Sequence, residues 1–207
     1  MSLLAVVTAL VLALPVGLVL GHLRRGGVLA VNISNVGRAV PSFAILVIGA
    51  QLFGIGAKPA FAALVALAIP PVMTNTYVGM TSVDPDIVEA GRGMGMTAGQ
   101  MLLRVELPVA FPLIMAGVRT SAVNVVATAS LAALVAWGGL GRYIVDGLAQ
   151  QNKPMLFVGA VLVALLSVLT ELGLALLQRA FTSPGLRGEA SKVDLAPVAG
   201  AATAPTA

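Results

Sequence analysis

The residues best suited to chemistry gather in one stretch near the middle of the chain. Residues 89–108 read EAGRGMGMTAGQMLLRVELP and contain two Glu, two Arg and four Gly within an otherwise apolar sequence. The segment GRGMG resembles a phosphate-cradling loop, but no strand is expected before it and no Gly-Lys-Ser/Thr follows it. We therefore exclude nucleotide binding and ATP hydrolysis by this chain, and any ATP must be bound by a partner subunit.

The chain offers few other groups for catalysis or metal binding. It contains no Cys, which excludes disulfide frameworks and thiolate metal sites, and one His, His22. We expect no metal, no cofactor and no enzymatic activity. The net charge of +4 and the pI near 10.1 do not indicate a nucleic acid partner, because orientation in a membrane explains basic residues beside apolar segments better.

Composition places the chain in a lipid bilayer. Apolar residues make up 58% of it and charged residues 10%, whereas soluble domains are typically about 25% charged. A spanning helix needs roughly 20 apolar residues, so the sequence predicts an all-α polytopic membrane protein with about five spanning helices. The expected spans are residues 2–22, a segment within 28–54 whose apolar part is 39–54, then 60–80, 112–136 and 155–178.

The distribution of Lys and Arg predicts the orientation. The first segment is interpreted as a retained helix, because its charges follow the apolar run, unlike those of a cleaved signal peptide. With an outward N-terminus and a cytoplasmic C-terminus, nine basic residues lie inside and three outside, as cytoplasmic loops prefer. Inside are Arg24, Arg25, Arg38, Arg92, Arg104, Arg119, Arg179, Arg187 and Lys192; outside are Lys58, Arg142 and Lys153.

Two regions follow from this pattern. Residues 1–182 form the expected transmembrane domain, with a cytoplasmic loop at residues 84–108 that we call the central loop. Residues 183–207 are rich in Ala, Pro and Gly without periodicity and are expected to be a disordered cytoplasmic tail.

The central loop is predicted to contain two short helices. Asp84 as N-cap and Pro85 at the first helical position begin the first, which runs to about Gly91 or Arg92; Gly93 and Gly95 then permit a sharp turn. Thr97 begins the second helix with a capping-box pattern, and this helix must end before Pro108. The loop would expose Met94, Met96, Met101 and Leu102, either for docking into a groove of a partner or for contact with lipid headgroups.

The spacing of Glu89-Ala90-Gly91, Gly95, Val105 and Leu107-Pro108 resembles the EAA motif of ABC-importer permeases. That motif has Ala where this chain has Gly91 and Ile where it has Val105. The resemblance implies the type I permease fold of ABC importers, and a coupling helix within the central loop that docks on a cytoplasmic ATPase. The implied docking segment includes Glu89, Ala90, Gly91, Gly95, Met101, Leu102, Val105, Leu107 and Pro108.

Further segments at residues 35–46, 70–97, 106–135 and 138–148 resemble permeases of the osmoprotectant branch, which import glycine betaine, carnitine, choline and related quaternary amines. The resemblance implies a bacterial cytoplasmic (inner) membrane location. It also implies three kinds of partner: cytoplasmic ATP-binding subunits, an extracytoplasmic substrate-binding protein, and a second permease that is either a copy of this chain or a paralogue.

Polar residues inside two spans are candidates for the translocation path. Pro70 and Pro71 leave backbone carbonyls without donors, so they form either a structural kink or a broken helix along the path, with Thr74 and Asn75 one turn on. Asn124 and Thr128 share one helix face, either for hydrogen bonds between helices or for lining a pore.

Two acidic residues and the low aromatic content give little indication of a substrate site in this chain. Glu171, within the last span, is best explained by a snorkelling or ion-paired structural role near Arg179, although intramembrane charges are functional candidates. Asp146 is interpreted as a solvated loop charge, the alternative being a contact with a cationic ligand or with the protein that delivers it. Aromatic residues are only 4% of the chain, too few for an evident cation–π cage, so substrate selection is expected in the separate binding protein.

Two alternatives remain at this point: an ABC permease for another small solute such as an amino acid, and a secondary carrier. A carrier would need charged residues at mid-membrane, and none is seen away from helix ends. The sequence does not choose among quaternary amines or between a homodimer and a heterodimer.

Overall fold

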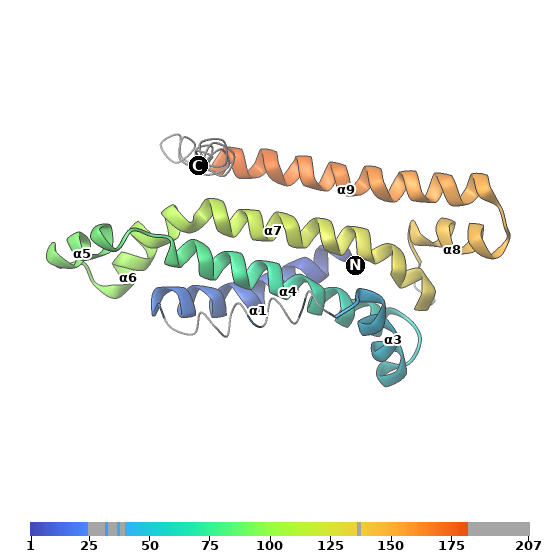
Figure 1. Cartoon of the computed structure of the whole chain (residues 1–207), viewed down its shortest axis with the longest axis horizontal. Coiled ribbons are helices and arrows are strands. Elements are labelled where there is room, and N and C mark those ends of the chain that lie inside the picture. Colours follow the sequence, from blue (N-terminus) through green and yellow to red (C-terminus); the bar gives the residue numbers. More distant parts are fainter. Residues whose placement is uncertain (25–31, 33–36, 38–39, 136–137, 182–207) are drawn as a thin grey trace, which may run out of the picture.

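The structure is a computed structural model that describes residues 1–24, 32, 37, 40–135 and 138–181. This part of the chain is built from helices, with no strand (Figure 1). The helices are α1 (Ser2–His22), α3 (Ser42–Phe53), α4 (Ala57–Thr81), α5 (Pro85–Gly93), α6 (Ala98–Met101), a π-helix (Leu102–Glu106), α7 (Leu107–Ala129), a 3₁₀ segment (Ser130–Val135), α8 (Gly141–Ala149) and α9 (Lys153–Phe181).

Four helical segments in the described residues are long and apolar enough to cross a membrane: Ser2–His22, Ala57–Thr81, Ala98–Leu134 and Lys153–Ala180. They correspond to four of the five expected spans. The other expected span contributes α3, whose 12 residues are fewer than the roughly 20 that a crossing needs. Most of the lead-in to α3, and the tail predicted to be disordered, lie outside the described residues.

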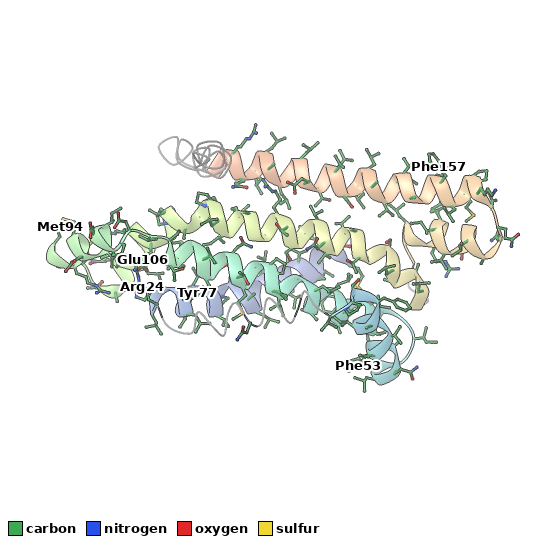
Figure 2. The ribbon with its side chains drawn as sticks, viewed as in Figure 1. Arg24, Phe53, Tyr77, Met94, Glu106 and Phe157 are labelled. Carbon is green, nitrogen blue, oxygen red and sulfur yellow. The ribbon has the colours of Figure 1, made fainter. Side chains whose placement is uncertain are left out.

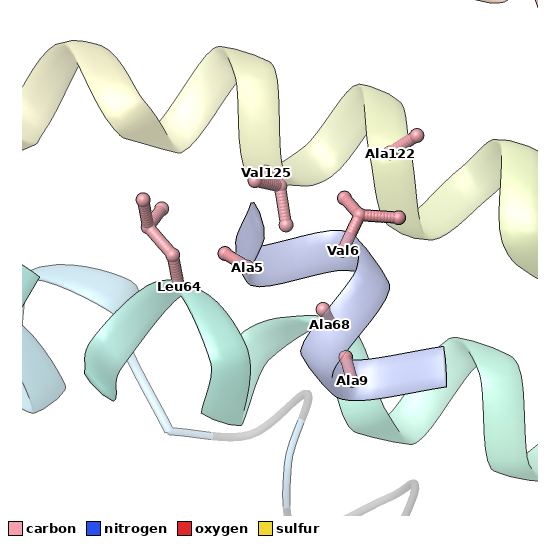
Figure 3. Close-up of a cluster of buried hydrophobic side chains, with 7 residues drawn as sticks. All are labelled: Ala5, Val6, Ala9, Leu64, Ala68, Ala122 and Val125. Atoms are coloured by element: carbon pink, nitrogen blue, oxygen red, sulfur yellow. The ribbon is translucent and has the colours of Figure 1, made fainter. Parts of the chain in front are cut away.

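The core of the bundle is formed by α1, α4 and α7. Small side chains let the backbones approach: a Cβ added at Gly17 would lie 2.8 Å from Cβ of Thr76, and one added at Gly21 would overlap Met80. Gly17 and Gly21, which form a Gly-x-x-x-Gly pair, therefore allow close contact between α1 and α4. Figure 3 shows the cluster buried where the three helices meet: Ala5, Val6, Ala9, Leu64, Ala68, Ala122 and Val125.

The last helix, α9, runs along α7 and is joined to it by an ion pair (Figure 1). Nε of Arg119 in α7 lies 2.8 Å from Oε1 of Glu171 in α9, and Arg119 also donates to the side-chain oxygen of Gln178 at 3.3 Å. Glu171 is thus ion-paired as expected, but with Arg119. Arg119 lies well inside α7, so it does not belong in the count of basic residues near cytoplasmic span ends, and the predicted count becomes eight inside and three outside. The expectation that charged residues lie only near helix ends is also wrong, because Arg119 and Glu171 lie within spanning helices.

The central loop extends from one end of this bundle. In Figure 1 the C-terminal ends of α1 and α9 lie at the same end as α5 and α6, whereas α3 and α8 lie at the opposite end. The helices thus hold the central loop beyond the bundle.

Candidate functional site

Helix α5 begins as its sequence predicts. The side chain of Asp84 accepts a hydrogen bond from the backbone N–H of Asp86 at 2.9 Å, and Pro85 occupies the first turn. The helix continues to Gly93, slightly beyond the expected end. The turn that follows depends on Gly95 alone, whose φ of +79° is in a region that residues with a Cβ rarely adopt; Gly93 is still helical.

Helix α6 begins with the expected capping box. The backbone N–H of Thr97 donates to Oε1 of Gln100 at 2.9 Å, and the N–H of Gln100 donates to Oγ1 of Thr97 at 3.4 Å. These two bonds satisfy N–H groups that a helix start otherwise leaves free. Together with the Asp84 cap, they give the central loop a defined shape.

The prediction that the second helix ends before Pro108 is wrong. From α6 the chain continues through the π-helix Leu102–Glu106 directly into α7, and Pro108 lies in the first turn of α7. In a regular α-helix the ring of Pro108 would clash with the carbonyl of residue 104. Residue 104 lies within the wider π-turns, so the path of the helix changes where the proline would otherwise end it. The second part of the central loop, from Ala98 onward, is consequently a continuous extension of a spanning helix.

The central loop has its own small apolar core. Val83, Val88 and Met101 are buried, and Met96 and Val105 pack against them. The expectation that Met101 projects toward a partner is therefore wrong, since only 3% of it is exposed; four residues after Thr97, it faces back toward α5. Leu102 is also partly covered, by Met80 and Ala110. The large apolar side chains of the central loop that remain exposed are Met94, 77% exposed, Leu103, 64% exposed, and Ile87.

The residues of the EAA-like motif divide into an outer and an inner set. Glu89, Ala90 and Pro108 are exposed, whereas Gly91 is buried and Leu107 and Val105 are partly buried. A Cβ at Gly91 would overlap the terminal methyl of Met101. The glycine at this position is therefore matched to the methionine that fills the space beside it.

Two contacts join the central loop to the end of α1, and sequence reasoning missed both. Nδ1 of His22 lies 2.5 Å from Oε2 of Glu106, and the guanidinium of Arg24 donates to the carbonyl of Val83 at 2.8 Å. Figure 2 labels Arg24 and Glu106 at this end of the bundle, with Met94 further out. The available signal was the presence of the single His at a span end, but nothing local connects it with Glu106.

A pocket of about 290 Å³, here called the proline pocket, brings together four of the six predicted path residues. Pro41 and Ser42 lie at the start of α3, Pro70 and Pro71 in α4, and Asn124 and Thr128 in α7; the other lining residues are Gly37, Val40 and Leu67. Asn124 and Thr128 thus share a face, and that face meets the two prolines.

The other two predicted path residues lie elsewhere. Asn75 donates its side-chain N–H to the carbonyl of Pro71 at 2.8 Å, and the hydroxyl of Thr74 is buried without a hydrogen-bond partner in the structure. Helix α4 is not broken at the prolines but continues from Ala57 to Thr81. The broken-helix alternative is therefore wrong. Ser121 of α7 donates to the carbonyl of Ala68 at 2.9 Å, whereas the carbonyls that Pro70 and Pro71 leave without a backbone donor are those of Ala66 and Leu67.

Comparison with known proteins finds similarity over nearly the whole chain. Residues 10–183 match the sequence model of the family described as "Binding-protein-dependent transport system inner membrane component". The glycine betaine/carnitine/choline transport system permease protein OpuCB of Bacillus subtilis (strain 168) is 37% identical, over 90% of this chain and 86% of that protein. The choline transport system permease protein OpuBB of the same organism is 38% identical over the same shares. The carnitine transport permease protein OpuCB of Listeria monocytogenes is 37% identical, over 90% and 85%.

Among solved structures, the fold is similar to inward-facing forms of the MetNI methionine ABC transporter. One form superposes with a TM-score of 0.76 at 24% identity, covering 88% of this chain and 92% of that chain. Another crystal form gives 0.74 at 25% identity over the same shares. The arrangement of α1, α4, the central loop and α7 thus has a counterpart in a solved membrane protein.

Proposed function

Because this chain belongs to the family of binding-protein-dependent transport system inner membrane components, we propose that it forms half of the transmembrane pore of an ATP-driven importer of quaternary amines. The central loop carries this proposal: a capped, internally packed unit that continues into α7 and exposes Met94 and Leu103 beyond the bundle. Such a unit suits docking into a groove of a cytoplasmic ATPase.

Transmission follows from how the central loop is attached. Its first helix follows α4 after a short turn at Ser82, and its last residues continue into α7 without a break. Closure of two ATPase subunits around ATP would move the docked loop, and the loop would carry α4 and α7 with it. A packed unit keeps its shape under force better than a flexible one. The apolar core around Met101 would therefore help the central loop to transmit movement from the ATPase to α4 and α7.

The proline pocket is proposed as part of the translocation path. It lies between α3, α4 and α7, and the described lining offers hydroxyl and amide groups but neither a carboxylate nor an aromatic ring. A trimethylammonium group is normally held by aromatic faces, so this pocket suits passage better than tight binding. We therefore place selection in an extracytoplasmic binding protein and assign betaine, carnitine or choline as cargo because the similar permeases are named for them.

The proposed orientation has the central loop in the cytoplasm and the N-terminus outside. Arg92 and Arg104 belong to the central loop, whereas Arg142 and Lys153 belong to α8 and the start of α9 at the opposite end of the bundle (Figure 1). The loop end also holds Arg24. This distribution supports the orientation because positive residues concentrate on the cytoplasmic side.

The test is transport by a reconstituted complex of this chain, its ATPase, a second permease and a binding protein in sealed vesicles. We expect uptake of radiolabelled glycine betaine only with ATP and with the ATPase present. Glu89→Lys and Gly95→Trp should abolish ATP-driven uptake while membrane insertion is retained. Glu89→Gln, which keeps the size of the side chain, is the matched variant for the first substitution.

Three outcomes would contradict the proposal. Uptake at full rate without the ATPase would indicate a secondary carrier. Inhibition by an excess of an amino acid but not of choline or carnitine would indicate another cargo. Normal uptake by both loop variants at normal levels in the membrane would remove the docking role.

A further inference from the structure

Glu106 is a buried acid at the point where the central loop joins its spanning helix. It is the last residue of the π-helix, and only 3% of it is exposed. A buried carboxylate is costly unless a partner satisfies it. Within the described residues, the side chain at hydrogen-bond distance from the carboxyl group of Glu106 is that of His22, whose Nδ1 lies 2.5 Å from Oε2. The two residues are 84 positions apart in the chain.

A second contact connects the same end of α1 with Val83, the residue immediately before the central loop. Arg24, just beyond the end of α1, has a φ of +49°, in the left-handed region that residues with a side chain seldom adopt. From this position its guanidinium reaches the carbonyl of Val83, immediately before the N-cap of α5. The end of α1 thus holds the central loop both before α5 and after α6.

Helix α1 has no covalent connection to the central loop, unlike α4 and α7. Gly17 and Gly21 let the C-terminal half of α1 pack closely against α4. The C-terminal end of α1 lies beside the start of the central loop. The contacts of His22 and Arg24 therefore give a direct connection between the loop and α1, in addition to the packing of α1 against α4 and α7.

We propose that His22 and Glu106 are a positioning pair that fixes the central loop to the end of α1, so that α1 moves together with the loop in each transport cycle. The proposal rests on the proposed function, because it concerns how movement of the docked loop reaches the helices. The pair stays closed throughout the cycle, and its loss lets the loop move without α1. ATP hydrolysis then continues while less substrate moves for each ATP.

The first experiment measures substrate transported per ATP hydrolysed in vesicles that contain the complete complex. His22→Gln and Glu106→Gln are each expected to lower this ratio about tenfold, as loss of a charge-assisted hydrogen bond would, with ATP hydrolysis per complex largely kept. Exchange of the two residues, His22→Glu with Glu106→His, should recover most of the ratio. Arg142→Gln, which breaks the exposed pair with Asp146 in α8, is the matched control and should leave the ratio unchanged.

The second experiment uses a covalent link in place of the contact between His22 and Glu106. The chain contains no Cys, so His22→Cys combined with Glu106→Cys provides the only thiols of this subunit. With both thiols reduced, this variant should transport little substrate per ATP hydrolysed. A short, reducible cross-linker that joins the two thiols should restore the amount transported per ATP. The same reagent should not affect the unsubstituted chain.

The outcomes separate this proposal from the proposed function. Transport blocked by the link and restored by reduction would show that the pair must open, which overturns the proposal. Unchanged ratios in both glutamine variants, or no recovery on linking a correctly assembled complex, would overturn it equally. Failure of ATP-driven uptake by the unsubstituted chain would instead count against the proposed function.

Discussion

At the residue scale, the fit between Gly91 and Met101 determines how the two helices of the central loop meet. A Cβ at position 91 would overlap the terminal methyl of Met101 and lie 3.3 Å from the sulfur of Met96. The EAA pattern has Ala at this position, so this chain has one methyl group less on α5 and a flexible methionine beside it. Methionine adapts to such spaces because its side chain is unbranched.

This fit predicts that substitutions at the two positions are not additive. Gly91→Ala should change the free energy of unfolding by less than about 1 kcal/mol, because crowding of the flexible Met101 side chain offsets the higher helix propensity of Ala. Met101→Ala should destabilise by about 2–5 kcal/mol through loss of buried volume. In the double variant the new methyl group at position 91 has room. The loss in free energy of unfolding should therefore be smaller than the sum for the two single variants by about 0.5–3 kcal/mol. Unfolding of purified protein in mixed micelles measures these differences; strictly additive losses would contradict the fit.

Residues that interact locally could be predicted from sequence, and distant partners could not. The caps of Asp84 and of Thr97 with Gln100 join groups two or three positions apart, and such caps have recognisable sequence patterns. The sequence predicts either a snorkelling or an ion-paired role for Glu171 near Arg179, whereas its partner Arg119 lies on another helix. The contact of His22 with Glu106 depends on the relative placement of α1 and α7, which no local pattern contains.

At the element scale, the π-helix sets the direction of the central loop relative to α7. A π-helix has i→i+5 hydrogen bonds and thus wider turns than an α-helix, and such segments often occur at functional sites. Leu102–Glu106 adopts this form directly before Pro108. The same feature explains why the predicted helix end was wrong, since the sequence rule for proline assumes regular α-helical turns. At Pro70 and Pro71 the proline rule is likewise wrong, since α4 continues through both residues from Ala57 to Thr81.

Removing one residue from the π-helix should misdirect the loop without unfolding the spans. Deletion of Arg104 is expected to convert the segment to α-helix, in which the ring of Pro108 clashes with the carbonyl four residues before it. The helix should then kink before Pro108 and change the direction of α5 and α6 relative to α7. ATP-driven uptake should be lost and the amount of protein in the membrane kept. Arg104→Ala, which preserves the length of the segment, is the control and should retain uptake; normal uptake by the deletion variant would rule out a directing role.

At the scale of the whole molecule, the two ends of the bundle differ in charge and in form. One end holds the central loop with Arg92 and Arg104, and the other holds α3 and α8 (Figure 1). Composition was sufficient to predict spans, because their apolar runs exceed the length that a bilayer requires. The proline pocket and the groove of about 1100 Å³ between α1, α7 and α9 could not be predicted, because both arise only from how the helices are arranged.

Single cysteines can establish which end faces the cytoplasm, since the chain contains none of its own. Met94→Cys in the central loop and Leu148→Cys in α8 both replace exposed side chains. In right-side-out vesicles, a membrane-impermeant maleimide should label the cysteine at position 148 and not the one at position 94. Inside-out vesicles should give the reverse, and labelling of position 94 from outside would refute the proposed orientation.

The ion pair between Arg119 and Glu171 has a consequence for biogenesis. A ribosome synthesises α7 well before α9, so Arg119 enters the insertion machinery while its carboxylate partner has not yet been made. A lone guanidinium at the centre of a spanning helix disfavours release into lipid by about 2.5–3.5 kcal/mol on translocon scales. Helix α7 is therefore expected to remain beside the translocon until α9 emerges, and the two would then partition together as a neutralised hairpin, with α8 as the hinge between them.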